Sequence, residues 1–142
     1  MPQETLLFST TVMENTIIIA GDLCPRERVA KMIESNQYQE VFQDVKPVVE
    51  QANYAIVNLE APIVEGKGVP IAKSGPNLRC TERVIDAIRF AGFKGVTLAN
   101  NHFYDYGEDG ALNTMQKLKE NGIAYVGVGK NTEDAAKILY VT

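Results

Sequence analysis

Three short polar clusters follow apolar runs in this sequence, and their residue types suit metal binding. The clusters are Gly21-Asp22, Asn58-Leu59-Glu60 and Asn100-Asn101-His102, and His102 is the only histidine of the chain. The runs before them are predicted strands of a parallel sheet, and ligands bind just beyond the carboxyl ends of such strands. Carboxylate, amide and imidazole groups suit Mn²⁺, Fe²⁺, Zn²⁺ or Mg²⁺. Because paired ions activate water and hold a phosphoryl oxygen, we expect a metal-assisted phosphoester site.

Each of these residues also has a simpler structural explanation. Asp22 is typical of a turn with an Asx hydrogen bond, and Glu60 is equally explained as a loop cap or as the partner of a lysine. A lone His102 is more often a satisfied polar residue, and Asn100-Asn101 suits a turn with left-handed backbone angles. Singly, these residues favour structural roles, whereas three clusters at successive strand ends favour a site.

The elements that position these clusters alternate between strands and helices. Apolar, β-branched runs predict strands over residues 16–20, 54–57, 96–99, 123–126 and 138–141. Helical signals cover residues 26–51 (one or two helices, interrupted near Ser35-Asn36 and disturbed at Pro47), the stretch from an N-cap at Thr81 to Gly92, residues 107–121, and a short turn at 132–136. This alternation predicts an α/β fold with a mainly parallel sheet flanked by helices. The first fifteen residues show no clear period and are predicted to form an arm or an edge strand.

Composition narrows the class of protein. The chain has 142 residues, of which 45% are apolar and 23% charged, and this fits a single globular domain. A net charge of −4 provides no basic face for nucleic acid or anionic lipid. Cys24 and Cys80 lie far apart without CxxC spacing, so neither a disulfide framework nor a zinc knuckle is predicted. Without a leader or an apolar run of membrane length, we predict a cytoplasmic protein with no membrane segment, or a cell-envelope protein if a leader has been removed.

Two further patterns concern a loop and a helix. The long loop over residues 61–80 carries Lys67, Lys73 and Arg79. It either closes over an anionic substrate or is a solvated surface loop, and the sequence favours neither interpretation. In the helix over residues 107–121, Leu112, Met115 and Leu118 have the spacing of a core-facing stripe.

The sequence resembles the CapA family of bacterial capsule (poly-γ-glutamate) synthesis proteins, which are related to calcineurin-like metallophosphoesterases. The resemblance rests on Asp22 after an apolar strand, on Val57-Asn58-Leu59-Glu60, and above all on Leu98-Ala99-Asn100-Asn101-His102-Phe103-Tyr104-Asp105-Tyr106-Gly107. It implies the N-terminal half of a metallophosphoesterase-like α/β sandwich. It also implies a divalent cofactor, Mn, Fe or Zn, bound as one or two ions.

The resemblance implies roles for five residues whose positions match the family motifs. Asp22, Glu60 and Asn101 match metal ligands, with Glu60 at the position of a bridging acid. His102 matches a catalytic donor to the leaving or non-bridging oxygen of the substrate. Asp105 is placed to orient His102, as such sites commonly require.

Three more side chains are expected to support the site. Asn58 and Asn100 are expected to hydrogen-bond the metal ligands or the phosphate, and Arg79 is expected to contact the substrate from the loop. The expected substrate is a small anion or phosphoester, or an anionic polymer.

Two departures from the family pattern bear on activity. Cys24 stands where the superfamily usually has a His, and a small buried cysteine is favoured over a metal thiolate. The superfamily completes its metal site with downstream His residues, whereas this chain has one His and runs to Thr142. We therefore expect residues 1–142 to be a metallophosphoesterase-type domain that is incomplete at its C-terminus. We also expect it to self-associate through the strand predicted at residues 138–141.

Two other functions compete with a phosphoester hydrolase. A non-catalytic metal- or anion-binding module would keep the fold and lack the second half of the site. A doubly wound nucleotide-binding domain is disfavoured, because no Gly-x-Gly-x-x-Gly or Gly-Lys-Ser/Thr loop follows the first predicted strand. The link to capsule synthesis rests on resemblance alone, since a shared fold does not fix function.

Overall fold

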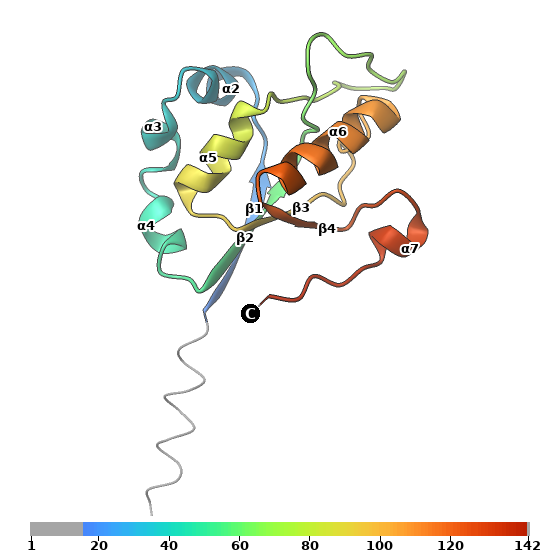
Figure 1. Ribbon diagram of the computed structural model, residues 1–142. Coiled ribbons are helices and arrows are strands. Elements are labelled where there is room, and N and C mark those ends of the chain that lie inside the picture. The colour runs from blue at the N-terminus through green and yellow to red at the C-terminus, as the bar shows by residue number, and fades with distance from the viewer. Residues whose placement is uncertain (1–15, 142) are drawn as a thin grey trace, which may run out of the picture.

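The computed structural model describes residues 16–141, whose four strands form one parallel sheet (Figure 1). The strands are β1 (Ile17–Leu23), β2 (Tyr54–Leu59), β3 (Gly95–Thr97) and β4 (Ala124–Val126), and they neighbour each other in chain order. Each neighbouring pair is parallel. The predicted α/β class with a mainly parallel sheet is therefore confirmed. The arm or edge strand predicted for the first fifteen residues lies outside the described residues.

Six helices connect or follow these strands within residues 16–141. They are α2 (Glu27–Glu34), α3 (Tyr38–Phe42), α4 (Lys46–Val49), α5 (Arg83–Ala91), α6 (Gly107–Glu120) and α7 (Thr132–Ala135). Between β1 and β2 there are three helices, where the sequence predicts one or two. The first break contains Asn36, whose φ of 59° no α-helix allows. Pro47 lies in the first turn of α4, where a missing N–H costs nothing, so it begins a helix instead of disturbing one. Among residues 16–141 no helix is long and apolar enough to cross a membrane.

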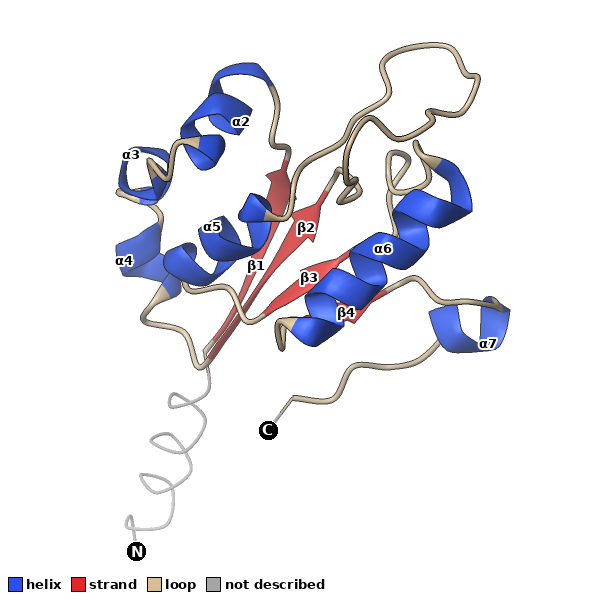
Figure 2. Cartoon of the chain, turned by 45° about the horizontal axis from the view of Figure 1, so that its top comes forward, coloured by secondary structure: helices blue, strands red, loops and turns tan. Residues whose placement is uncertain are grey.

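The hydrophobic core lies between one face of the sheet and helices α5 and α6, which cross that face in Figure 2. The sheet contributes alternate residues of its strands, and the helices contribute apolar stripes; the fully buried members include Leu59, Ile85, Ile88, Val96, Leu98 and Leu118. The alternation of buried and half-buried residues along β2 shows that only one face of this strand is covered.

The opposite face of the sheet is apolar and largely open. Ile17 and Ile19 of β1 are 59% and 78% exposed. Ile138, Leu139 and Val141 lie beside this face and line a hollow of about 480 Å³ together with residues of β1 and β2. Residues 138–141 form no strand, so the fifth strand predicted there is wrong. Three of the four residues are exposed, with Ile138 at 71% and Tyr140 at 82%, so this run adds apolar surface beside the open face.

Two smaller predictions about helices are also wrong. Thr81 does not cap α5, because the N-cap residue is Glu82 and the Thr81 hydroxyl donates a hydrogen bond to Glu34. On α6, Met115 and Leu118 are buried as predicted, but Leu112 is 37% exposed. Leu112 therefore lies at the margin of the core-facing stripe and not within it.

Candidate functional site

Three polar side chains meet at the carboxyl ends of β1, β2 and β3. Asp22 pairs in register with Asn58, and Asn58 pairs with Thr97. The Asn58 amide nitrogen donates to Asp22 Oδ1 at 2.7 Å, and the Thr97 hydroxyl donates to Asn58 Oδ1 at 3.0 Å. Because residues in register on neighbouring strands point to the same face, these three side chains form a continuous polar row.

A bulge in β1 aligns Asp22 with this row. Ile19 pairs with Ile56 and Asp22 with Asn58, so β1 has one residue more than β2 between the two pairs. Such a bulge re-aims the side chains that follow it. In a regular ladder Gly21 would lie opposite Asn58, and the Asp22 carboxylate would point to the other face of the sheet.

Asn100 joins the turn after β3 to this row. Its amide nitrogen donates to Asn58 Oδ1 at 3.2 Å and to the Leu59 carbonyl oxygen at 2.9 Å. Its amide oxygen accepts the His102 backbone N–H at 3.0 Å. The sequence left two roles open for Asn58 and Asn100, and these contacts are those of residues that hold other site residues in place.

His102 and Asp105 form the second part of the network. His102 Nδ1 lies 2.7 Å from Asp105 Oδ2, and the same oxygen accepts the Leu78 backbone N–H at 2.6 Å. Asp105 is 1% exposed. Burial raises the pKa of Asp105, but hydrogen bonds from Lys73, His102 and Leu78 outweigh it and hold this pKa below its ordinary value. The ionised carboxylate can only accept, so Nδ1 carries a proton and Nε2 is left for another partner.

The other expected metal ligands lie beside the network without a side-chain bond to it. Glu60 follows β2 and is half-buried, and its backbone N–H donates to the Leu23 carbonyl oxygen at 3.1 Å. Asn101 is exposed in the turn between Asn100 and His102. The thiol of Cys24 lies near Glu60; burial first, and then this carboxylate, raise the pKa of Cys24 to about 11. With this pKa Cys24 is a thiol at neutral pH, and it is half-buried, where the sequence predicts a buried cysteine.

These residues fit a divalent cation in the type of their donors but not in number. Carboxylate and amide oxygens suit Mn²⁺ or Mg²⁺, and an imidazole suits Fe²⁺ or Zn²⁺. Yet within the described part of the chain no group of three or more His, Cys, Asp or Glu side chains is placed to hold a metal ion. Asp22, Glu60 and Asn101 can therefore supply only part of a coordination shell.

The long loop is bound to the site by Lys73 and not by Arg79. The Arg79 guanidinium donates to the carbonyl oxygens of Gly66 and Lys67 at 2.8 and 2.6 Å, and it lies 5.9 Å from the ring centre of Tyr106. These contacts close the loop on itself and leave the substrate role expected of Arg79 without support from its position. Lys73 instead forms an ion pair with Asp105.

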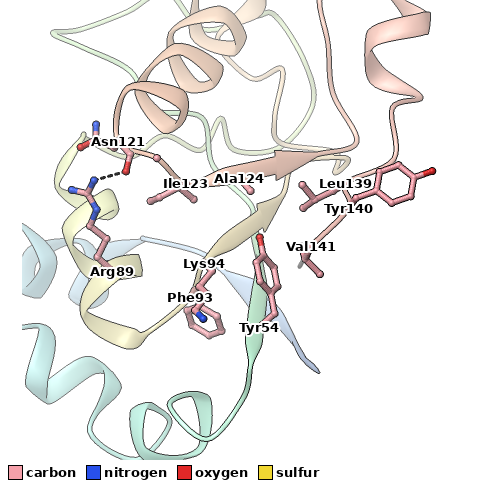
Figure 3. Close-up of a pocket in the computed structure, with 11 residues that line it drawn as sticks. Tyr54, Arg89, Phe93, Lys94, Asn121, Ile123, Ala124, Leu139, Tyr140 and Val141 are labelled. Carbon is pink, nitrogen blue, oxygen red and sulfur yellow. Dashed lines mark hydrogen bonds between the residues drawn. The ribbon is translucent and has the colours of Figure 1, made fainter. Parts of the chain in front are cut away.

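A hollow of about 520 Å³ lies at the other end of the strands (Figure 3). It is lined by Tyr54 at the start of β2, by Lys94 just before β3, and by Arg89 of α5. Its two cations are engaged with backbone carbonyl oxygens, Arg89 with Asn121 and Lys94 with Asn53. This hollow is therefore separate from the network and contains none of the expected site residues.

Sequence reasoning missed Thr97 and left Lys73 as one of three loop cations. Thr97 has a readable signal, because it is the polar residue between two apolar ones in a predicted strand that borders the strand of Asn58. Lys73 has none, since it is 32 residues from Asp105 and lies in a loop without a periodic pattern.

The class of protein is therefore an α/β domain with a parallel sheet and with linked Asp, Asn and His residues at the carboxyl ends of its strands. The chain matches the family described as "Bacterial capsule synthesis protein PGA_cap" over residues 16–142 and belongs to it. It is 32% identical over 127 residues to the capsule biosynthesis protein CapA of Bacillus anthracis, an alignment with 88% of this chain and 31% of the relative. It is 27% identical over 117 residues to the PGA biosynthesis protein CapA of Bacillus subtilis, with 82% of this chain and 31% of that relative. The chain thus spans about a third of the length of these curated relatives.

Proposed function

We propose that this chain carries the first part of a metal-dependent phosphoester site in a protein of capsule or poly-γ-glutamate synthesis. The observation that supports this most is the hydrogen-bond network that runs from Asp22 through Asn58 and Asn100 to His102 and Asp105. It fixes a carboxylate and an imidazole at the strand ends, and among residues 16–141 it uses neither the second carboxylate oxygen of Asp22 nor Nε2 of His102. The printed names of the two Bacillus relatives support the link to capsule and PGA biosynthesis.

In this proposal Asp22, Glu60 and Asn101 hold the ion. The ion would be Mn, Fe or Zn, of which Mn suits oxygen ligands best, and one or two ions would polarise a phosphoryl oxygen and activate water. Asn58 holds one oxygen of Asp22, which leaves the other for the cation. Asn100 fixes the turn from which Asn101 and His102 project.

His102 acts on the substrate through Nε2. When the ring carries both protons, Nε2 donates a hydrogen bond to a phosphoryl or leaving-group oxygen. The ionised Asp105 accepts from Nδ1 in either protonation state and so keeps the ring in one orientation. The substrate would be a small anionic or phosphoester molecule, or an anionic polymer.

A second candidate function is a non-catalytic metal- or anion-binding module. The observation that favours it is that residues 16–141 contain no group of three His, Cys, Asp or Glu side chains fit for a metal. We infer that residues outside this chain complete the site. A catalytic metal needs a fixed coordination shell, so we expect the isolated chain to bind a cation and to turn over little substrate.

Metal binding is tested by thermal unfolding with Mn²⁺ or Zn²⁺. An ion that binds only the folded state adds about 2.7 kcal/mol at a free concentration of about 100 Kd, so the melting temperature should rise. Asp22→Ala should abolish the rise, and Asp44→Ala, the same change at an exposed position between α3 and α4, should keep it. Equal rises in the wild type and in Asp22→Ala would place the binding elsewhere and end the proposal.

Turnover of an aryl phosphate by the same samples separates the two candidates. Robust turnover that is lost in His102→Ala would show a complete site within this chain. Binding without turnover agrees with the partial site. Binding that stays without turnover after the chain is extended to the length of its relatives would favour the non-catalytic module.

A further inference from the structure

Lys73 reaches from the long loop into the contact between His102 and Asp105. Lys73 lies in an exposed stretch of the loop, but its side chain is only 22% exposed, and its ammonium forms an ion pair with Asp105 Oδ1. The same nitrogen lies 3.3 Å from His102 Nδ1. The ammonium of Lys73 is therefore bound to the His102–Asp105 pair and does not extend freely into solvent.

The contacts of Asp105 show what Lys73 does there. Asp105 Oδ2 already accepts two hydrogen bonds, from His102 Nδ1 and from the Leu78 N–H, so Lys73 is the partner of the other oxygen. The Asp105 backbone carbonyl accepts a hydrogen bond from the Ile71 N–H at 2.9 Å. Both Ile71 and Leu78 belong to the loop, so the loop surrounds Asp105 on its backbone and on both carboxylate oxygens.

Both Lys73 and the protonated Nδ1 of His102 are donors, and they share one acceptor group. Lys73 therefore does not bond to the ring; it acts on the ring through Asp105. A buried carboxylate without its cation is costly, and without Lys73 only the two hydrogen bonds at Oδ2 hold it in place. The acceptor of the Nδ1 proton of His102 would then be held less firmly.

We propose that Lys73 is a positioning residue that clamps Asp105, so that His102 keeps its proton on Nδ1 and leaves Nε2 for another partner. That Nε2 then meets a substrate rests on the function proposed above. The orientation of the ring by Lys73 does not rest on it, because every contact involved lies within the protein. The test can therefore be done without metal or substrate.

Because His102 is the only histidine, nitrogen-15 NMR of the ring reports this site alone. In the wild type, at a pH where the ring is neutral, we expect one set of signals with Nδ1 protonated and Nε2 unprotonated. In Lys73→Met we expect a mixture of both tautomers, with the Nδ1–H form falling to about half and the signals broadened. Lys73→Arg should restore the wild-type pattern, because a guanidinium supplies the same charge and donors.

Lys67→Met is the matched control, because Lys67 is an exposed lysine of the same loop. It should leave the His102 spectrum unchanged. If Lys73→Met does not fold, Lys73→Ala, which also removes the donor and the charge, takes its place. A wild-type spectrum in a folded Lys73→Met or Lys73→Ala variant would overturn the proposal, even if that variant were less stable. A wild-type chain that shows the expected tautomer but binds no metal would refute the proposed function and leave the role of Lys73 intact.

Discussion

At the scale of single residues, the site is held together by two side-chain amides, each of which forms hydrogen bonds through both its nitrogen and its oxygen. Asn58 and Asn100 each direct the amide nitrogen and the amide oxygen to neighbours, so neither side chain can turn over without breaking bonds at both ends. An amide that both donates and accepts can join a carboxylate to a turn, which a carboxylate in its place could not do. The positions of Asp22 and His102 are thus set by neutral neighbours that add no charge to the rim.

Asp105 carries the charge on which the second part of the network depends, and this predicts a pH dependence. Its pKa in the folded state lies below its ordinary value, so its ionised form stabilises the fold. This stabilisation is fully present above the unfolded pKa of about 3.9 and is lost as the pH falls through the folded pKa. Asp105→Asn should therefore lower the free energy of unfolding by about 1–3 kcal/mol at pH 7, and the difference from the wild type should shrink in acid.

Urea unfolding at neutral pH and below the unfolded pKa measures that difference directly. Asp86→Asn makes the same chemical change at an exposed position on α5 and should leave the free energy of unfolding close to the wild type at both pH values. If the cost of Asp105→Asn were the same at both pH values, it would come from lost packing and not from the charge of Asp105.

At the scale of elements, the sequence predicts the sheet and its polar strand ends. It does not predict the bulge in β1 that brings Asp22 beside Asn58. Four β-branched runs predict the four strands, because strands buried in a parallel sheet are continuously apolar. The run at residues 138–141 has a similar composition and is not a strand, because an apolar composition alone does not specify pairing with a neighbouring strand. The bulge that turns Asp22 toward Asn58 is a shift of one residue in register, which no pattern of hydrophobicity specifies.

Contacts between residues far apart in the chain are equally impossible to predict from sequence patterns. The motif from Asn100 to Asp105 is readable because its members are close together, and its partner Lys73 is not. The start of the long loop gives a second case. The buried Ile63 backbone is bound by two side chains of α6, Thr114 and Asn113, whose own pattern predicts only a helix.

The Thr114 side chain should therefore contribute more to the free energy of unfolding than its small size suggests. Its hydroxyl is fully buried, accepts the Ile63 N–H at 2.8 Å, and donates to the Gly110 carbonyl oxygen at 2.7 Å. Thr114→Val keeps the shape and leaves the Ile63 N–H without its partner, so we expect a loss of about 2–3 kcal/mol in the free energy of unfolding. Thr114→Ser keeps the hydroxyl and removes one methyl group, which should cost about 1 kcal/mol. An equal cost for both changes in chemical denaturation would mean that packing and not the hydrogen bond holds the loop.

At the scale of the whole molecule, the two faces of the sheet have different roles: the covered face forms the core, and the open face carries the polar row. Parallel sheets are normally covered on both faces, and here helices cover one of them. The open face carries Ile17, Ile19 and Ile56 along most of its length and the Asp22–Asn58–Thr97 row at its carboxyl end. Any layer that packs on the apolar part of this face therefore also borders the polar row.

This arrangement predicts self-association of the isolated chain through the open face. The sequence suggests the same outcome through an edge strand at residues 138–141, but these residues form no strand, so the apolar face is the better cause. Exposed contiguous apolar surface of this kind favours association, because its burial removes it from water. We expect the wild type to sediment as a species larger than the monomer, and Ile19→Glu or Ile138→Glu to shift it toward the monomer.

Val69→Glu is the matched control for this prediction, since Val69 is 84% exposed, more than Ile19 at 78% or Ile138 at 71%, but lies in the long loop. It makes the same change of an apolar residue to a carboxylate and alters the net charge equally, so any effect of charge alone would appear in all three variants. Sedimentation velocity over a range of concentrations distinguishes the cases. A monomeric wild type at every concentration would show that the apolar face is tolerated in water. Equal dissociation by Val69→Glu would show that repulsion between chains, and not loss of an apolar contact, drives the change.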